Sequence, residues 1–379
     1  MSQGELFGIG SLEKLKDILQ ENAPRRIFFV TQKELLKVLN LEEQLRELLK
    51  GYAVSFFFDV KINPDIVSLT SGIQTLHEYG ADLVIALGGG SVMDTAKAIA
   101  LLSQQKGNAE EYVTQAKPIG HLALPVIAIP TSSGTGAEAT HFAVVYIGKT
   151  KYSLAHESML PSYAIIDPAL TFSLPASITA ATGMDALAQC IEAYWSVNSN
   201  EESKQYAEEA ISLILENLLL VVKSPTPESR SAMSKAAHLS GKAINIAQTT
   251  ACHAISYPFT SYYGIPHGHA VGLTLPSMIE YNAQVTKEDC QDQRGAEYVK
   301  NGMQKVITLL GAKDATEAKE KIEQLMDEIG LERKLSRLGI ATDEDINLII
   351  VNGFNPQRMK NNPRQVTREA LKSLLEQIR

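Results

Sequence analysis

The chain has 379 residues, of which 45% are hydrophobic and 21% are charged, so it can bury more than one core and is not disordered. The net charge of −8 is spread along the sequence without a block of lysines or arginines, which argues against a nucleic-acid surface. Three scattered cysteines exclude a disulfide framework, and no apolar stretch reaches the roughly 18 residues that span a membrane. These features predict a cytoplasmic protein.

From residue 12 to about residue 170, helical patterns alternate with short apolar runs that resemble buried strands. Strands are expected at residues 26–31, 53–58, 83–87 and 126–129. Apolar spacings of three and four predict crossover helices at residues 12–20, 34–49 and about 65–79. This alternation is typical of a parallel sheet covered by helices.

After Leu174-Pro175 the sequence changes to long segments rich in Ala, Leu, Glu and Lys, at residues 200–222, 228–247 and 316–329. These segments predict a helical second domain. Asp167-Pro168 and Leu174-Pro175 interrupt the helical and strand patterns, which places a boundary at about residues 170–178. We therefore expect an α/β domain with a Rossmann-like sheet over residues 1–174 and an all-α domain over residues 175–379.

The predicted strand at 83–87 leads into Gly88-Gly89-Gly90-Ser91 and then into a segment with good helix propensity. In such a junction the glycines let the backbone approach a pyrophosphate, and the helix start at Ser91 to Asp94 attracts the anion. The alternative is a tight turn without a ligand, because the spacing is not G-x-G-x-x-G.

A second polar loop, residues 130–140, follows the predicted strand at 126–129 and carries several hydroxyls and two glycines. A loop at the carboxyl end of a strand suits a cofactor crevice, although by itself it is equally an ordinary turn. Gly8-Ile9-Gly10 is a poorer phosphate loop, since no convincing strand precedes it and Glu13 occupies the third glycine position. Two such loops in one α/β domain favour a dinucleotide site.

A further group of residues has the chemistry of a metal site. His253 and His267 lie 14 residues apart, and Asp185 and Gln189 lie four apart in a predicted helix, so the latter two share one face. Two imidazoles, a carboxylate and an amide oxygen form a mixed set that binds divalent first-row metals. By spacing alone, each histidine also fits a loop or core position.

At this point the sequence resembles the iron-containing (group III) alcohol dehydrogenases over nearly its whole length. The agreement lies in six collinear segments: 88–97, 130–138, Lys151 with 166–168, 183–187 with 191–194, 264–268 and 362–364. The resemblance implies a nucleotide-binding first domain, a helical second domain that binds metal and substrate, and a metal in the cleft between them. It also implies a nicotinamide-dependent oxidoreductase.

The resemblance assigns cofactor contacts to Gly88, Gly89, Gly90, Ser91, Asp94, Thr131, Ser132, Thr135 and Lys151. It assigns three metal ligands to Asp185, His253 and His267. The fourth ligand is a histidine in most members, and Gln189 stands in its place. An amide oxygen is a weaker and harder donor than imidazole, so we expect lower affinity for one divalent metal, iron or zinc or manganese.

Tyr257 stands where the family commonly has a histidine near the metal, and its hydroxyl is a candidate proton carrier. His269 is a second candidate, with a structural role as an equal alternative. Gln32, after the first predicted strand, cannot repel a 2′-phosphate, so NAD(H) is expected and NADP(H) remains open.

The resemblance also implies a substrate pocket that differs from that of general alcohol members in having Lys242 and Phe142, and at the position of Lys242 those members tend to be apolar. Lys242 precedes His253 by 11 residues, about three helical turns, so a continuous helix would put both on one face. With Gln189 and the segments 195–198 and 253–258, the chain resembles the branch that reduces phosphonoacetaldehyde or sulfoacetaldehyde. Lys242 is then a catalytic-site contact for the anion, with a solvated helix surface as the alternative.

We therefore expect an NAD(P)H-dependent and metal-dependent aldehyde reductase that acts on a short anionic aldehyde, as a homo-oligomer such as a dimer. The first alternative is a general primary-alcohol dehydrogenase. The others are a lyase similar to dehydroquinate synthase, whose extra basic residues are not recognisable here, and an inactive nucleotide-binding homologue that lost its chemistry with the histidine at position 189.

Overall fold

The structure of the chain, a computed structural model, describes residues 3–379 apart from the side chains of residues 357 and 358. Residues 1 and 2, with which the predicted first domain begins, lie outside the described residues. The chain forms two compact units, of which the first ends at Leu174 and the second begins at Pro175. Among the described residues, no helix combines the length and the apolar character needed to cross a membrane.

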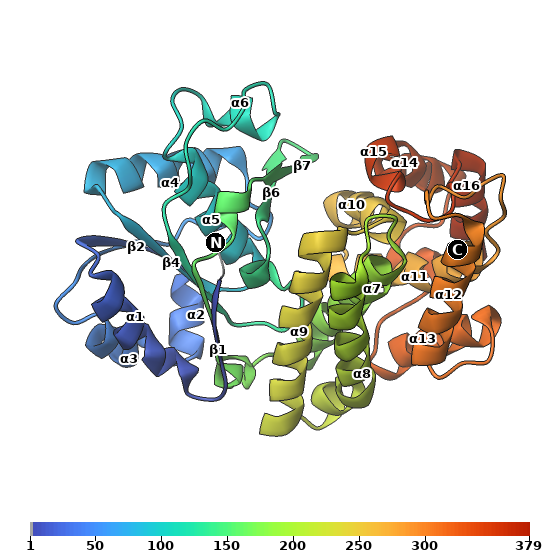
Figure 1. Ribbon diagram of the computed structural model, residues 1–379, viewed down its shortest axis with the longest axis horizontal. Coiled ribbons are helices and arrows are strands. Elements are labelled where there is room, and N and C mark those ends of the chain that lie inside the picture. The colour runs from blue at the N-terminus through green and yellow to red at the C-terminus, as the bar shows by residue number, and fades with distance from the viewer. Residues whose placement is uncertain (1–2) are drawn as a thin grey trace. The chain divides into compact units, whose positions relative to one another are not determined.

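A six-stranded parallel sheet forms the centre of the first unit (Figure 1). Its order is β1-β8-β5-β4-β2-β3. The strands are β1 (Gly4–Phe7), β2 (Arg26–Val30), β3 (Ala53–Phe57), β4 (Leu83–Gly88), β5 (Val126–Pro130) and β8 (Tyr163–Ile166). A separate antiparallel hairpin joins β6 (Phe142–Ile147) to β7 (Thr150–Ala155). The predicted α/β class is confirmed, and all four predicted strands occur within one residue of their predicted limits.

The helices of the first unit are α1 (Leu15–Asn22), α2 (Lys33–Val38), α3 (Glu42–Leu48), α4 (Ile66–Tyr79), α5 (Gly90–Leu102) and α6 (Ala109–Val113). The prediction of one helix over residues 34–49 is wrong, because Asn40 adopts the left-handed conformation, with φ of 52°, between α2 and α3. The helix predicted at 12–20 begins as a 3-10 turn, Ser11–Lys14, and continues as α1.

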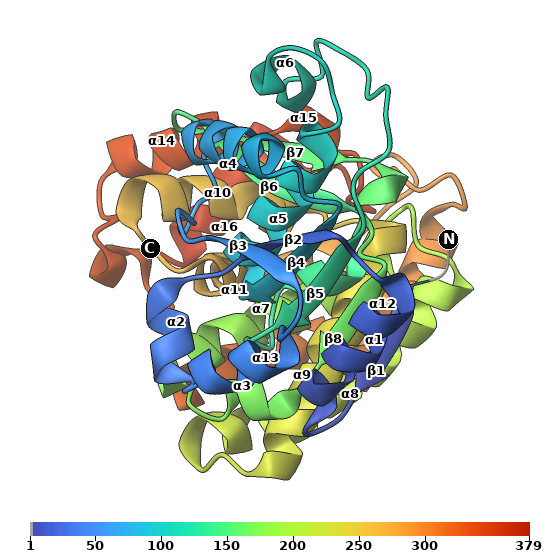
Figure 2. The same ribbon diagram turned by 90° about the vertical axis from the view of Figure 1, so that its left-hand side faces the viewer.

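Side chains of the central strands alternate between two hydrophobic cores, one on each face of the sheet. In β2, Ile27 and Phe29 join the core with α1, α2 and α3, whereas Phe28 and Val30 join the core with α4, α5 and α6. Figure 2 shows these two groups of helices on opposite sides of the sheet. Because the strands are buried on both faces, they stand out in the sequence as continuous apolar runs.

A strand does precede Gly8-Ile9-Gly10, contrary to the expectation from the sequence. The four residues of β1 alternate between half-buried and exposed positions, so they form no apolar run. The turn after β1 binds a carboxylate of the protein itself, because Asp167 accepts hydrogen bonds from Gly10 N and Leu12 N, both at 3.1 Å. These amides are therefore already satisfied without a phosphate.

The second unit is helical, which confirms the predicted all-α class. Its helices are α7 (Ala176–Trp195), α8 (Glu201–Lys223), α9 (Pro227–Ala247), α10 (Ala251–Tyr263), α11 (His267–Ala283), α12 (Ala296–Leu309), α13 (Ala315–Glu328), α14 (Asp343–Gly353), α15 (Pro356–Met359) and α16 (Arg368–Gln377). α7 is central, since it packs against α8, α9, α11 and α12 and is buried over nearly all of residues 179–195. Polar side chains inside such a helix are exceptional, so Asp185, Gln189 and Glu192 mark it as a functional element.

The polar region at 285–315 supports the segment that follows α7. Arg294 pairs with Asp292 and donates to three backbone oxygens in residues 196–199, directly after α7. Asn362, from the last segment of the family resemblance, exchanges side-chain hydrogen bonds with Asn282 on α11. Both features hold segments that are distant in sequence against the helices of this unit.

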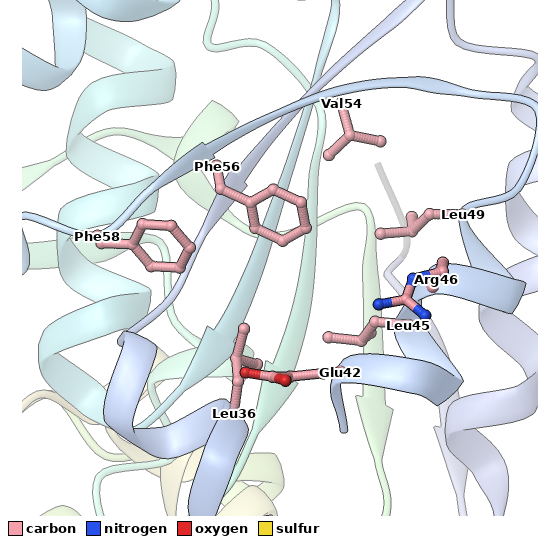
Figure 3. A pocket seen from close by; sticks show the side chains of 8 residues that line it. All are labelled: Leu36, Glu42, Leu45, Arg46, Leu49, Val54, Phe56 and Phe58. Carbon is pink, nitrogen blue, oxygen red and sulfur yellow. The ribbon is translucent and has the colours of Figure 1, made fainter. Parts of the chain in front are cut away.

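An apolar groove borders β3, which is an edge strand of the sheet (Figure 3). Val54, Phe56 and Phe58 line one wall, and side chains of α2 and α3 line the other. The rings of Phe56 and Phe58 are stacked, with centroids 5.7 Å apart. The groove thus belongs to the face covered by α2 and α3, and its mostly apolar lining offers little catalytic chemistry.

Candidate active site

The glycine turn lies where the strand order of the sheet reverses. β3 lies beyond β2, whereas β5 and β8 lie beyond β4, so the carboxyl ends of β2 and β4 flank the switch point at which such sheets bind nucleotides. β4 ends at Gly88 and α5 begins at Gly90. The first helical bonds join Val92 N and Met93 N to Gly89 O, and the amides of Gly90 and Ser91 precede them. These two amides are suitable donors for a phosphate.

The loop of residues 131–140, called the hydroxyl loop below, packs directly against the glycine turn. Thr131 N donates to Gly88 O at 3.0 Å. A Cβ atom on Gly90 would lie 2.8 Å from Thr135 Cγ2, so this close approach requires glycine, whereas a Cβ atom on Gly89 would lie 3.4 Å from Ser132 Oγ. The structure therefore brings seven of the nine predicted cofactor residues together: Gly88, Gly89, Gly90, Ser91, Thr131, Ser132 and Thr135.

The other two predicted cofactor residues, Asp94 on α5 and Lys151 on β7, lie in the same unit. Asp94 accepts a hydrogen bond from Val144 N at 3.0 Å and lies 3.7 Å from the ammonium of Lys97. Burial raises the pKa of Asp94, against the opposing charges of Lys97 and Lys151. Lys151 on β7 is therefore close enough to act on Asp94, while contacts of either residue with a cofactor stay predictions.

Three of the four predicted metal-binding residues converge within the second unit. Asp185 lies on α7, His253 on α10, and His267 is the first residue of α11. Asp185 Oδ1 lies 3.4 Å from His253 Nε2 and 3.9 Å from His267 Nε2, and the ligand atoms all lie within 4.8 Å of one another. This spacing fits a cation between them, with bonds of about 2.0 to 2.2 Å.

Each of the two histidines is held through its Nδ1 atom. Glu192 Oε2 contacts His253 Nδ1, and Ser256 Oγ lies 3.4 Å from His267 Nδ1. The Nε2 atoms are thereby directed toward Asp185. His253 Nε2 is buried and has no well-aligned hydrogen-bond partner among the described residues, which fits a metal ligand. Burial lowers the pKa of His253, but Glu192 and Asp185 outweigh burial and raise it to about 9, so a cation bound at this site would have to displace a proton from the imidazole.

The carboxylate of Glu192 also fixes the beginning of α10. It is fully buried, and Oε1 accepts hydrogen bonds from Thr250 Oγ1 at 2.6 Å, Cys252 N at 2.8 Å and Thr250 N at 3.2 Å. Amides at a helix start carry partial positive charge, so they stabilise this buried anion. Sequence reasoning missed Glu192 as a site residue, although it follows Asp185 by seven positions and thus shares its face of α7.

The amide of Gln189, the fourth predicted ligand, lies between Asp185 and Ser240. Gln189 Nε2 is 3.4 Å from Asp185 Oδ2, and Ser240 Oγ donates to Gln189 Oε1 at 2.8 Å. In this orientation the amide supports the carboxylate. After a half-turn of the amide its oxygen would face Asp185, and its NH₂ group would donate to Ser240, whose hydroxyl lies 2.9 Å from Ala237 O. The Ser240 hydroxyl can donate to the amide oxygen of Gln189 or accept from its NH₂ group, so it is compatible with both orientations. Coordination by Gln189 therefore stays a prediction.

Helix α11 approaches α7 very closely at Gly268. A Cβ atom on Gly268 would lie 1.9 Å from Ala181 O and 2.7 Å from Asp185 Cβ. Only glycine permits this approach of the two backbones. Because His267 is the preceding residue, the same contact brings its imidazole to Asp185.

Two of the predicted catalytic residues lie on helices that carry predicted metal ligands. Tyr257 follows His253 by one turn of α10 and therefore shares its face. His269 Nε2 lies 2.6 Å from Glu332 O, and burial lowers the pKa of His269. These surroundings favour the structural alternative for His269.

The third predicted catalytic residue, Lys242, lies on α9. Its ammonium lies 4.7 Å from the centroid of the Tyr206 ring on α8. The continuous helix assumed between Lys242 and His253 is wrong, because α9 ends at Ala247 and α10 begins at Ala251. Helical register therefore gives no reason to place Lys242 beside His253, and its contact with a substrate stays a prediction.

The α/β unit with a glycine turn and the helical unit with an Asp-His-His cluster together define a metal-binding, nucleotide-dependent dehydrogenase class. The model of the iron-containing alcohol dehydrogenases matches residues 4–168, and the model of the C-terminal part of the Fe-containing alcohol dehydrogenase family matches residues 179–379. The chain belongs to the iron-containing alcohol dehydrogenase family, and it is an oxidoreductase.

Three relatives illustrate the range of this family. Phosphonoacetaldehyde reductase of Streptomyces viridochromogenes is 37% identical over 330 residues, which cover 84% of this chain and 80% of the relative. Alcohol dehydrogenase 4 of Saccharomyces cerevisiae is 31% identical over 378 residues, which cover 97% and 95%. The solved sulfoacetaldehyde reductase of Bifidobacterium kashiwanohense, in complex with NAD⁺, is 31% identical with a TM-score of 0.87 and coverage of 99% and 96%.

Replacing Gly89 with valine should weaken dinucleotide binding without unfolding the protein. The first added carbon makes ordinary contact with Ser132, but the methyl groups crowd the space before the amides of Gly90 and Ser91. We expect the dissociation constant for NADH, measured by fluorescence titration, to rise about tenfold or more. Gly302→Ala is the control, because a Cβ atom there meets nothing within 4 Å. An unchanged dissociation constant in folded Gly89→Val would contradict this phosphate site.

Replacing Glu192 with glutamine should weaken metal binding, because a neutral amide holds the imidazole of His253 less firmly. We expect the affinity for Zn²⁺, measured by competition with a chromophoric chelator, to fall about 10- to 100-fold. Glu216→Gln, at an exposed position of α8, is the matched control. Circular dichroism of both metal-free variants separates loss of metal from loss of fold. Equal affinities in two folded variants would show that Glu192 only anchors α10.

Proposed function

We propose that the chain is a metal-dependent and NADH-dependent reductase of short aldehydes that carry a phosphonate or sulfonate group. The observation that carries this proposal is the cluster of Asp185, His253 and His267, in which both Nε2 atoms are aimed at one point beside a carboxylate. Two of the relatives support the substrate class, since their names contain phosphonoacetaldehyde and sulfoacetaldehyde.

The second unit, residues 175–379, is the proposed metal and substrate domain. Asp185, His253 and His267 would hold a divalent cation, which would supply Lewis acidity for the carbonyl oxygen of the aldehyde. This donor set suits Fe²⁺, Zn²⁺ or Mn²⁺. The task of the protein is to keep the two imidazoles oriented, which Glu192 does for His253 and Ser256 does for His267.

The first unit, residues 1–174, is the proposed cofactor domain. The amides of Gly90 and Ser91 would bind the pyrophosphate, and the hydroxyl loop would lie along the nicotinamide end. Reduction moves a hydride from nicotinamide C4 to the aldehyde carbon and a proton to its oxygen, which gives a primary alcohol and NAD⁺. We assign the proton to the hydroxyl of Tyr257, because Tyr257 shares a face of α10 with His253. The NAD⁺ complex of a solved relative supports NADH over NADPH.

A general primary-alcohol dehydrogenase is the second candidate, favoured by the similarity to alcohol dehydrogenase 4 over 97% of the chain. The family match gives no support to a lyase similar to dehydroquinate synthase. The intact Asp-His-His cluster argues against an inactive homologue. A homo-oligomer such as a dimer stays a prediction, which light scattering after size-exclusion chromatography tests.

A panel of aldehydes tests the substrate class. Phosphonoacetaldehyde, sulfoacetaldehyde, propanal and butanal are compared with NADH and with NADPH, after the protein is loaded with Fe²⁺, Zn²⁺ or Mn²⁺. We expect kcat/KM to be about tenfold or more higher for the anionic aldehydes, since a partly desolvated charged contact has this effect. His267→Ala should keep the fold and lose the activity. Equal kcat/KM for both classes would leave the general dehydrogenase, and turnover of metal-free protein would contradict metal dependence.

Lys242→Met tests whether Lys242 recognises the anion. If it does, kcat/KM should fall about 10- to 100-fold for the anionic aldehydes and stay constant for propanal. Lys235→Met is the control, because Lys235 lies on the same helix in an exposed ion pair with Glu209. Equal losses for charged and neutral aldehydes would instead assign Lys242 to the packing of α9 on α8 through Tyr206.

A further inference from the structure

Lys97, on α5, is a buried cation that the proposed reaction does not use. Its side chain is 1% exposed. Its ammonium lies 2.8 Å from Ala137 O, 2.9 Å from Thr140 Oγ1, 3.2 Å from Thr140 O and 2.5 Å from Phe142 O. Three N–H groups are thus shared among four oxygen atoms, all of which belong to the hydroxyl loop or the two residues after it.

These contacts replace a regular ladder of backbone hydrogen bonds. Residues 137–139 form a single 3-10 turn, and the chain then turns into β6 at Phe142. A buried carbonyl without a donor costs free energy, so the ammonium is what permits this irregular path inside the unit. The charge of Lys97 is balanced nearby, since Asp94 Oδ1 lies 3.7 Å away.

The hydroxyl loop is therefore fixed to α5 at two places. In the middle of the loop, Thr135 packs against Gly90 at the beginning of α5. Toward its end, Ala137, Thr140 and Phe142 are bound by Lys97, two turns further along α5. A change at Lys97 must consequently alter the position or the mobility of the loop relative to the glycine turn.

We propose that Lys97 is a positioning residue for the dinucleotide: it fixes the hydroxyl loop to α5 and sets Thr131, Ser132 and Thr135 at their distance from the amides of Gly90 and Ser91. This inference rests on the proposed cofactor site. Lys97 does not touch the cofactor in this role, because its donors are occupied by the loop.

The test removes the ammonium and then returns it. In Lys97→Ala the missing atoms correspond to n-propylammonium, so this ion should fill the space. We expect the dissociation constant for NADH to rise about tenfold or more in Lys97→Ala, and n-propylammonium chloride to restore it to within about threefold, while sodium chloride at equal ionic strength does not. In Lys97→Met the apolar side chain occupies the space, so the defect should persist with the ion.

Lys204→Met is the matched control for loss of a buried lysine. Lys204 is 9% exposed and lies over the rings of Tyr194 and Tyr298 in the second unit, far along the chain from the hydroxyl loop. This variant should lower the unfolding temperature and leave the dissociation constant for NADH unchanged. A merely structural role of Lys97 would give the same result as this control.

Hydrogen exchange of residues 137–142 provides a readout that needs no cofactor. We expect faster exchange in Lys97→Ala and slower exchange again with n-propylammonium. Unchanged exchange and unchanged NADH affinity in a folded variant overturn the proposal, as does a loss of affinity that the ion fails to reverse. If neither Lys97 variant folds, Thr140→Val decides: an affinity for NADH at least about threefold weaker supports the role, and equal affinity overturns it. If the wild type binds no dinucleotide, the proposed cofactor site fails, and the exchange of residues 137–142 alone tests whether Lys97 fixes the loop.

Discussion

The cluster of Asp185, His253 and His267 depends on the hydrogen bonds that the buried carboxylate of Glu192 accepts. A negative charge without solvent is tolerated only with several donors, and here the start of α10 and the imidazole of His253 supply them. Helix α7 carries Asp185 two turns before Glu192, about 10 Å along the axis. One rigid helix therefore carries Asp185 and fixes His253 on another helix. The geometry of the Asp-His-His cluster is thus set by the core of the unit.

In the first unit, a buried positive charge likewise holds two segments of the chain together. The ammonium of Lys97 is enclosed by carbonyl and hydroxyl oxygens, and it binds an irregular loop to α5 as Glu192 binds the start of α10. The glycines at the beginning of α5 differ in the space around them. A Cβ atom on Gly90 would crowd Thr135 even without a ligand, whereas Gly89 has room for a small side chain.

The sequence predicted the four neighbouring strands β5, β4, β2 and β3, and it missed β1 and β8 on one side of the sheet. Strands buried on both faces appear as apolar runs, but β1 alternates with exposed positions, and the break at Asn40 leaves no signal in apolar periodicity. In the site, helical spacing predicts that Asp185 and Gln189 share one face of a helix. The approach of His253 and His267 to Asp185 depends on tertiary packing, which helical spacing does not predict. Glu192 could have been recognised from the sequence as a site residue, because it is a charged residue within a predominantly apolar helix. The condition of one continuous helix from Lys242 to His253 is not met, because the chain leaves α9 and starts α10 across residues 248–250.

The contact of α11 with α7 at Gly268 restricts how this enzyme can be altered. Libraries that vary Ser240 or Gln189 change side chains within an unchanged backbone. At position 268, by contrast, even alanine must displace a carbonyl of the neighbouring helix, because the added carbon would lie 1.9 Å from Ala181 O. That displacement moves His267 together with the helix. Directed evolution that substitutes Gly268 would therefore disturb the cluster of Asp185, His253 and His267 before any new substrate specificity could be selected.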